Sequence, residues 1–451
     1  MQKLYYQFPG TWFGDCMPFG HGDKFYLYHQ RDTRKPGPFG EPFGWDLATT
    51  SDFVHYEDKG VAIPRGTDEE QDQFIFAGSV FEAEGQYHIF YTGYNRDYPA
   101  LGKPSQVLMH AYSDDLVTWH KTQDALTFTP QEGYDPDDWR DPWVIRDEEN
   151  DQYLLILGAR LQGPKTRQTG RTVKFTSKDL KNWKFDCELT TENAFGYMWE
   201  CPDYFTLEGQ KVLSVSPQGL TREEFCFQNI YQSGYFILKD GKPEEKDFRE
   251  WDHGFDFYAP QTFQDGKDRR IIIGWMGMPD ADEEYVNPTA ESEGWQHCLT
   301  VPREVTYKNG MLYQYPVKEL NGLRENGTSI SGSSVELPVN GPFDLDIQVK
   351  GDQGKVSLGE NLFLEYQGGD VILTLSETAG AGRKVRKAHV PSGKVESLRI
   401  LADTTAVEIY VNGGEVVFST RYYPETQAQA VKVEAADVDG KIYGLKNYVM
   451  E

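Results

Sequence analysis

Three acidic residues lie at predicted strand starts and not in runs of charge. Asp15, Asp141 and Glu200 each lie beside a proline, cysteine or tryptophan, whereas the acidic runs at 68–70 and 147–149 are typical of exposed turns. If the three side chains meet, their like charges cannot all stay ionised, and at least one carboxyl pKa should rise. One proton donor beside one ionised carboxylate is the pair that glycoside hydrolysis needs. In a retaining enzyme such groups stand about 5–5.5 Å apart, and one of them forms a covalent glycosyl intermediate.

The residues next to these acids leave some alternatives open. Arg140 precedes Asp141 and could equally hold a sugar hydroxyl or neutralise its neighbour. Cys16 and Cys201 follow acidic residues, and because side chains alternate along a strand they should point away from the site into buried packing. The proposed chemistry requires no metal and no cofactor, and the sequence offers no convincing set of metal ligands.

The elements that would position the acids recur along the chain. A short apolar segment, a turn with Gly or Asp, and a strand rich in Tyr, Phe, Ile and Leu occur at 14–30, 76–93, 140–159, 200–217 and 258–275. Matched positions in the second strands are Tyr28, Tyr91, Leu157, Val215 and Ile273, so the copies are 63, 66, 58 and 58 residues apart. A second marker, a serine followed within two residues by an aspartate and then by an aromatic residue, begins at Ser51, Ser113 and Ser177.

A β-rich unit that repeats about every 60 residues, without helical periodicity between the copies, predicts a propeller. A β-solenoid has much shorter repeats, and two independent markers in register argue against a coincidental spacing of hairpins. We therefore expect an all-β protein in which residues 1–320 form a five-bladed β-propeller catalytic domain.

Equivalent positions on the innermost strands of a propeller meet around its central channel. Aligned by their turns, the repeats place the three acids near one phase, so the acids should converge at one end of the channel. At the equivalent position of the aligned repeats, blade 2 has Ser79 and blade 5 has Tyr258. Phe76 and Trp275, in the same two repeats, are further candidates for binding a substrate.

From about residue 335 the pattern changes to alternating strands without the marker. A hairpin is indicated at 406–419, where two such strands flank Asn412-Gly413-Gly414. Short strands at close spacing predict a β-sandwich domain at 335–451. The boundary should lie near 321–334, a stretch rich in Gly, Ser and Asn.

The overall composition limits the classes of molecule that the protein is expected to bind. The chain has 45 Lys and Arg against 71 Asp and Glu, a formal charge of −26, which would repel nucleic acid and anionic membranes but suits a neutral sugar. Five cysteines, an odd number without C-x-x-C spacing, argue against disulfides and zinc. The first residues lack the apolar region of a signal peptide, and no stretch of 18 apolar residues exists, so we expect a cytoplasmic protein without a membrane span.

Several motifs resemble those of a known family. The segments Arg140-Asp141-Pro142, 199–203, 257–263, 274–276 and 294–304 resemble motifs of glycoside hydrolase family 32, and the resemblance covers nearly the whole chain. It implies that Asp15 is the nucleophile, that Glu200 is the general acid/base, and that Asp141 stabilises the transition state and grips fructosyl hydroxyls together with Arg140. It further implies that Gln30 and Trp45 shape the pocket around the fructosyl ring.

The leading hypothesis is a retaining hydrolase that releases terminal β-D-fructofuranosyl units from sucrose, sucrose phosphate or short fructo-oligosaccharides. Around Asp15 the chain reads Trp-Phe-Gly-Asp-Cys-Met-Pro, where the family usually reads Trp-Met-Asn-Asp-Pro-Asn-Gly. This difference leaves a fructosyltransferase, or a hydrolase of another furanoside, as alternatives. A carbohydrate-binding protein without catalysis is a third, and the presence of all three acids argues against it.

Overall fold

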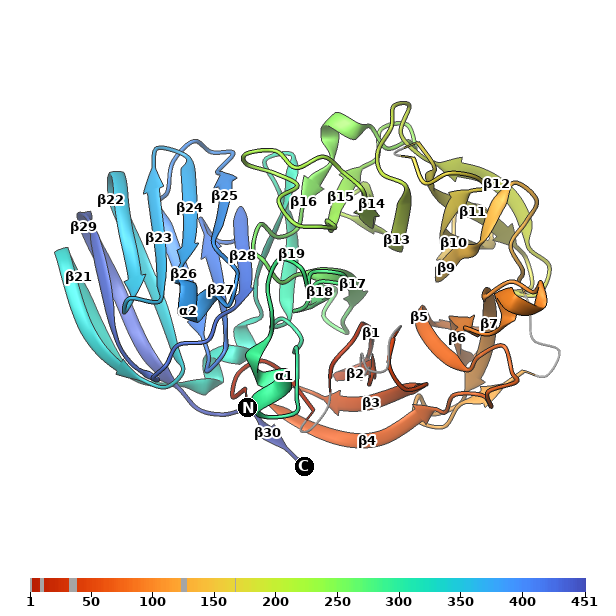
Figure 1. Cartoon of the computed structure of the whole chain (residues 1–451), viewed down its shortest axis with the longest axis horizontal. Helices are drawn as coiled ribbons and strands as arrows, with labels where there is room; N and C mark the ends of the chain where they lie inside the picture. The colour runs from red at the N-terminus through yellow and green to blue at the C-terminus, as the bar shows by residue number, and fades with distance from the viewer. Residues whose placement is uncertain (1, 9–11, 32–38, 123–127, 167) are drawn as a thin grey trace.

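The computed structural model describes residues 2–8, 12–31, 39–122, 128–166 and 168–451, and their strands form two units (Figure 1). Five antiparallel groups of four consecutive strands surround a common axis as the blades of a propeller. A larger sheet of nine strands, built from residues 324–445, lies beside the propeller. The prediction of an all-β fold with a five-bladed propeller followed by a β-sandwich is confirmed.

Each blade consists of four strands that follow one another in the sequence, with the first strand nearest the axis (Figure 1). Blade 1 contains β1 (Cys16–His21), β2 (Lys24–Gln30), β3 (Trp45–Thr50) and β4 (His55–Ile63). Blade 2 contains β5 (Phe74–Ala83), β6 (Gln86–Tyr94), β7 (Gln106–Ser113) and β8 (His120–Lys121), with the short helix η1 (Tyr98–Leu101) in a loop. Blade 3 contains β9 (Tyr134–Asp147), β10 (Gln152–Leu161), β11 (Gly170–Ser177) and β12 (Lys184–Leu189).

Blades 4 and 5 complete the ring. Blade 4 contains β13 (Met198–Leu207), β14 (Gln210–Gln218), β15 (Gly234–Ile237) and β16 (Arg249–Glu250), with η2 (Glu245–Asp247) in a loop. Blade 5 contains β17 (Tyr258–Gln264), β18 (Arg270–Trp275), β19 (Arg303–Lys308) and β20 (Met311–Pro316), with α1 (Pro288–Ser292) between β18 and β19.

The second sequence marker is the turn between the third and fourth strands of blades 1 to 3. In blade 2, Asp115 accepts hydrogen bonds at one carboxylate oxygen from the backbone N–H groups of Val117 (2.8 Å) and Thr118 (2.7 Å). Leu116, which follows Asp115, is buried and adopts a left-handed φ of 65°. Blades 1 and 3 repeat the device with Asp52 and Phe53, and with Asp179 and Leu180. An aspartate suits this place because its side chain can bond to backbone two or three residues on.

The C-terminal unit is one nine-stranded sheet whose two halves share three long strands, β21 (Arg324–Asn340), β22 (Phe343–Leu358) and β29 (Ala428–Leu445). The first half of β22 leads into β26 (Ser397–Ala402), β27 (Ala406–Val411) and β28 (Val416–Arg421), which include the expected hairpin. The second half leads into β23 (Leu362–Gln367), β24 (Asp370–Leu375) and β25 (Val385–His389), with α2 (Glu377–Gly380) between the last two. Register shifts at 332–334 and 350–354 separate the two halves.

The stretch expected to separate the domains is largely strand. The last propeller strand ends at Pro316, the short helix η3 (Lys318–Leu323) follows, and β21 already begins at Arg324. The polar residues at 324–334 face solvent on an outer strand, which explains why their composition suggested a linker. The change of unit therefore falls at the start of the predicted boundary stretch.

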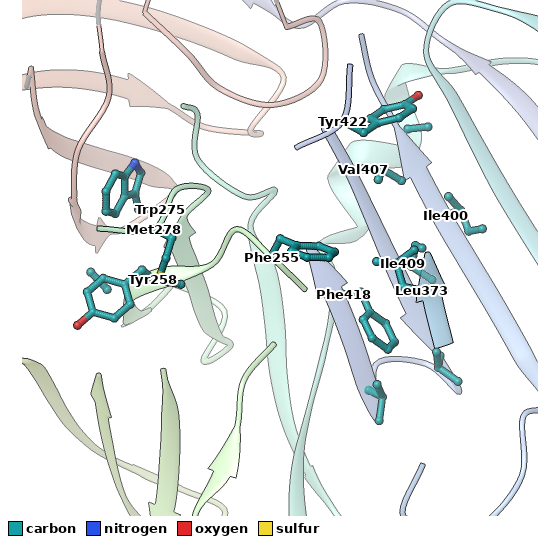
Figure 2. Close-up of a cluster of buried hydrophobic side chains, with 14 of the residues drawn as sticks. Phe255, Tyr258, Trp275, Met278, Leu373, Ile400, Val407, Ile409, Phe418 and Tyr422 are labelled. Carbon is teal, nitrogen blue, oxygen red and sulfur yellow. The ribbon is translucent and has the colours of Figure 1, made fainter. Parts of the chain in front are cut away.

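A buried hydrophobic cluster joins the two units. Figure 2 shows Phe255, from the segment between blades 4 and 5, with Trp275 and Met278 of the propeller on one side and Ile409 and Phe418 of the sandwich on the other. Burial of large apolar side chains is the main stabilising contribution in such contacts. The propeller and the sandwich thus share one continuous core.

Buried charges beside this cluster are paired across the interface. Arg303 of blade 5 has no exposed side-chain surface and lies 3.1 Å from Asp252 and 3.1 Å from Glu408 of the sandwich. Arg383 of the sandwich donates two hydrogen bonds, of 2.7 and 2.8 Å, to Asp256 of the propeller. A buried charge that loses its partner costs about 3–5 kcal/mol. These pairs therefore fix one relative position of the two units.

Both ends of the chain are held in the fold. The backbone N–H groups of Lys3 and Leu4 donate to the carboxylate of Asp403 in the sandwich at 2.7 and 2.6 Å. At the other end, β30 (Val449–Met450) adds a parallel strand to β4 of blade 1. Among the helices of the described ranges, we find none with the length and apolar character needed to cross a membrane.

Candidate active site

A cavity of about 320 Å³ opens at one end of the propeller axis. All five blades contribute to its walls, and the three acids selected from the sequence, Asp15, Asp141 and Glu200, line it together. The lining also includes five of the seven residues expected to bind a substrate, namely Arg140, Gln30, Phe76, Tyr258 and Trp275. Residues that are far apart in the sequence are thereby brought to one place.

The inner strands of blades 3, 4 and 5, two of which carry Asp141 and Glu200, are bulged. In blades 3, 4 and 5 two residues of the first strand oppose a single residue of the second, and the pairs are Asp141-Pro142, Cys201-Pro202 and Ala259-Pro260. The first residue of each pair has a positive φ, of 61°, 45° and 45° respectively. Residues other than glycine rarely adopt this conformation, and it concentrates at functional sites. Proline is tolerated because a bulged position need not donate to the strand ladder.

The bulges determine which side chains are equivalent. Arg140, Glu200 and Tyr258 each immediately precede a bulge, so they occupy the same position in blades 3, 4 and 5. Asp141 is the equivalent of Cys201 rather than of Glu200. The alignment by turns therefore placed the three acids at the correct end of the channel but shifted Asp141 by one residue relative to Glu200.

Glu200 is held by four hydrogen bonds. Its Oε1 accepts from Nε and Nη2 of Arg140 at 3.0 and 2.9 Å. Its Oε2 accepts from Nε2 of Gln218 at 2.7 Å and from the hydroxyl of Tyr258. With donors on both oxygens, the carboxylate has one orientation, and its side chain remains partly exposed to the cavity.

Arg140 belongs to an ion network. Its Nη1 donates to Asp138 at 2.8 Å, and Asp138 in turn accepts from Nε of Arg160 at 2.5 Å. By contrast, Nε of Arg140 lies 4.0 Å from Asp141. The short bonds of Arg140 thus orient Glu200, a role that was not considered from the sequence, while its contact with Asp141 is longer.

Asp141 lies deeper in the wall than Glu200. Its backbone N–H donates to the hydroxyl of Thr92 at 2.8 Å, and its Oδ2 accepts from the backbone N–H of Cys201 at 2.9 Å. Burial raises the pKa of the Asp141 carboxyl to about 6; the charge of Arg140 counteracts this and the negative charge of Glu200 adds to it. The expected raised carboxyl pKa therefore belongs to Asp141.

Cys201 corrects a sequence-based expectation. Simple alternation along the strand would turn it away from the acids, but the bulge places its sulfur 3.6 Å from Oδ2 of Asp141, within the cavity wall. Burial, followed by the charges of Asp141, Asp15 and Glu200, raises the pKa of its thiol. All three acids therefore lie close enough to this sulfur atom to raise the pKa of its thiol. Cys16 is buried outside the cavity, as alternation predicts.

Asp15 is placed by the pairing of the first two strands of blade 1. The backbone N–H of Gln30 donates to the carbonyl of Asp15 at 3.1 Å, and the N–H of Gly14 donates to the carbonyl of Gln30 at 3.3 Å. Asp15 and Gln30 thus sit opposite each other just before β1 and at the end of β2, where both line the cavity.

Two of the residues expected to bind a substrate do not line the cavity. Trp45 is fully buried, and its indole N–H donates to the carbonyl of Phe76 at 3.2 Å, so it supports the cavity wall from behind. Ser79 is also buried, and its hydroxyl accepts from the backbone N–H of Val144 at 3.1 Å, which ties blade 2 to blade 3. For Ser79 the phase was wrong because one extra residue precedes Gly78 in β5.

Other lining residues were not singled out from the sequence. They come mainly from loops or strand ends, and include Gln106, Asp138, Lys165, Tyr197, Gln218, Tyr231 and Asp280. Gln218 ends β14 as Gln30 ends β2, so its place at a strand end was the one available signal. The loop residues had no repeat marker that could have identified them.

Comparison with known proteins places the chain in a family. The model of the glycosyl hydrolases family 32 N-terminal domain matches residues 10–316, and that of the family 32 C-terminal domain matches 368–447. The chain belongs to glycosyl hydrolase family 32 and is a glycosidase. The resemblance seen in the motifs is confirmed.

Curated relatives and solved structures agree with this assignment. A sucrose-6-phosphate hydrolase of Bacillus subtilis is 36% identical over 397 residues, covering 84% of this chain and 80% of the relative. One of Staphylococcus xylosus is 32% identical over 422 residues, covering 88% and 82%. The structure of a sucrose-6-phosphate hydrolase from Lactobacillus gasseri shares the fold, with a TM-score of 0.86, 24% identity and coverage of 99% and 93%. A β-fructofuranosidase of Bombyx mori, solved as a substituted variant with sucrose, has a TM-score of 0.81, 26% identity and coverage of 99% and 94%.

The raised pKa of Asp141 predicts a pH-dependent gain in stability for Asp141→Asn. The carboxyl of Asp141 binds its proton more tightly in the folded protein than in the unfolded chain. Protonation of Asp141 therefore stabilises the wild-type fold fully below pH 4, and this stabilisation is lost as the pH rises through about 6. Asparagine does not titrate, and its amide oxygen can still accept from Cys201. We expect the free energy of unfolding of the variant, relative to the wild type, to increase by up to about 3 kcal/mol between pH 4 and pH 8.

Urea unfolding curves at several pH values measure this difference. Asp23→Asn is the matched control, because Asp23 is exposed in the turn between β1 and β2 of blade 1. A difference between Asp141→Asn and the wild type that stays constant from pH 4 to pH 8 would show that Asp141 titrates normally in the folded protein.

Proposed function

We propose that the protein is a retaining β-fructofuranosidase that cleaves sucrose, its 6-phosphate and short fructo-oligosaccharides. The observation that carries the proposal is the convergence of three carboxylates from three blades in one cavity, with one of them held by four donors. The family assignment and the names of the relatives support the substrate class. A phosphorylated sugar does not cross a membrane unaided, so we place the enzyme in the cytoplasm.

The proposed reaction uses two displacements. Asp15 attacks the anomeric carbon of the fructosyl unit while Glu200 donates its proton to the departing oxygen, so that a fructosyl ester forms on Asp15. Glu200, now ionised, accepts a proton from water, which attacks the anomeric carbon and releases fructose. Two inversions give net retention.

Asp141 and Arg140 have supporting roles in this scheme. The ionised Asp141 carboxylate, deep in the wall, can accept hydrogen bonds from fructosyl hydroxyls and stabilise the positive charge that develops on the ring. Arg140 fixes the direction of Glu200 and remains bound to Asp138, so the acid does not need to reorient during turnover. The protein's own side chains thereby supply every proton transfer in the scheme.

The test is a substrate panel followed by NMR in the first minutes of reaction. Sucrose, sucrose 6-phosphate, kestose, inulin, levan and an arabinofuranoside are incubated with the enzyme. We expect turnover of the first three, with β-fructofuranose as the first product formed. Initial release of the α anomer would rule out retention, and turnover of the arabinofuranoside alone would rule out the proposed substrate class.

A further inference from the structure

A row of tyrosines leads from Glu200 to the mouth of the cavity. The hydroxyl of Tyr258 donates to Glu200, and the ring of Tyr231 lies 6.0 Å from that of Tyr258, between ring centroids. The hydroxyl of Tyr197 donates to that of Tyr231 at 3.3 Å, and Tyr231 donates to Asp280 at 2.7 Å. These hydroxyls fix the two outer rings, which remain partly exposed in the cavity wall.

Lys165 stands at the outer end of this row. Its Nζ lies 5.2 Å from the ring centroid of Tyr197, and the side chain lines the cavity. Within the described ranges, Lys165 forms no ion pair, whereas Arg140, the other cation of the lining, is bound to Glu200 and Asp138. Lys165 is therefore the cation in the wall whose charge is available to a ligand.

The remaining charges at the mouth are negative. Asp137, Asp138 and Asp280 line the same cavity as Lys165. Burial opposes ionisation of Asp138, but Arg140 and Arg160, and to a smaller extent Lys165, lower its pKa. An anionic group entering between these carboxylates would be repelled unless a cation received it. A lysine can do so as a compact point charge with three donors.

The position of the scissile bond indicates what occupies the mouth. In the proposed reaction the fructosyl ring binds deep in the cavity, at Asp141, and the bond that breaks lies at Glu200. The leaving sugar must then extend outward from Glu200, along Tyr231 and Tyr197, toward Lys165. Partly exposed aromatic rings beside hydroxyl and carboxylate groups are suited to an uncharged sugar ring.

We propose that Tyr231 and Tyr197 bind the leaving sugar and that Lys165 pairs with a phosphate monoester carried by that sugar. The inference rests on the proposed function and adds the residue that distinguishes a phosphorylated from an unphosphorylated leaving group. A phosphate monoester carries about −1.5 to −2 charges near neutral pH. Lys165 supplies the charge that the acidic mouth otherwise lacks for this group.

The experiment compares two substrates in Lys165→Met. We measure kcat/KM for sucrose 6-phosphate and for sucrose, and follow their ratio. Loss of one charge-assisted hydrogen bond corresponds to a fall of about 10- to 100-fold in that ratio. Lys165→Arg should recover much of it because the charge is kept. In wild type, glucose 6-phosphate should inhibit more strongly than glucose, and Lys165→Met should reduce this preference.

Lys308→Met is the matched control, because Nζ of Lys308 lies 5.3 Å from the ring centroid of Tyr313 on the outer strands of blade 5. It removes the same charge and a similar ring contact outside the cavity, and should leave the ratio unchanged. A ratio that stays within twofold of wild type in Lys165→Met, or falls equally in Lys308→Met, overturns the proposal. If the wild type cleaved neither sucrose nor sucrose 6-phosphate, the proposed function itself would be refuted.

Discussion

Glu200→Gln should lower kcat on sucrose by about 10³- to 10⁴-fold, because glutamine cannot protonate the departing glucosyl oxygen. The fold should be unchanged, since the amide can keep all four hydrogen bonds with its three partner residues once Gln218 presents its carbonyl and the hydroxyl of Tyr258 accepts. With 4-nitrophenyl β-D-fructofuranoside, whose leaving group needs no proton, the first step should survive. We expect a burst of nitrophenolate equal to the enzyme concentration, followed by slow turnover, because the same variant also lacks the general base.

Glu188→Gln is the matched control for this substitution. Glu188 on β12 is bound by an arginine and a tyrosine, Arg171 and Tyr134, as Glu200 is by Arg140 and Tyr258, but it does not line the cavity. Its substitution should leave kcat within about twofold, as for most changes away from a site. Equal losses of Glu200→Gln on sucrose and on the nitrophenyl substrate, without a burst, would contradict the role of acid/base.

Asp15→Asn should abolish both steps. Without a nucleophile no fructosyl ester can form, so we expect kcat to fall by about 10⁴- to 10⁶-fold, and an activated leaving group should not restore it. This distinguishes Asp15 from Glu200, whose loss spares the first step when the leaving group is nitrophenolate. Acid quenching of the Glu200→Gln protein during its burst should trap the ester, and mass spectrometry should locate it on the peptide that contains Asp15.

Asp23→Asn again serves as the control, because it removes a carboxylate from the same blade at an exposed turn. A fructosyl group found on Asp141 instead of Asp15 would reverse the roles assigned to these two residues. A burst that persists in a protein carrying both Asp15→Asn and Glu200→Gln would show that the intermediate is not attached at position 15.

The fold could be predicted because the repeating information is local. Each of the turns at Asp52, Asp115 and Asp179 forms from the aspartate and the two or three residues that follow it, so its sequence reports its structure directly. The strands of the blades are likewise bounded by short turns. The boundary with the sandwich was less accessible, because the polar face of the edge strand β21 has the composition of a linker.

The site was harder to predict because it depends on departures from the repeat. Cys201 is buried as expected, but the bulge keeps its side chain beside the acids instead of pointing it away from them. The extra residue before Gly78 moves Ser79 behind the wall. Tyr231 and Lys165 are placed by loops whose course is decided by distant contacts. Asp141 and Glu200 could still be selected, since Pro142 and Cys201 beside them belong to the bulges, whereas Asp15 was selected by its place at the start of a strand.

The backbone bend shared by blades 3, 4 and 5 has a consequence for how such an enzyme can diversify. The same main-chain geometry presents an arginine and an aspartate in one blade, a glutamate and a cysteine in the next, and a tyrosine and an alanine in the third. The chemistry is therefore decided by which side chains occupy these equivalent positions, and the backbone does not need to change. Single substitutions at these positions can therefore change specificity while the propeller itself is preserved.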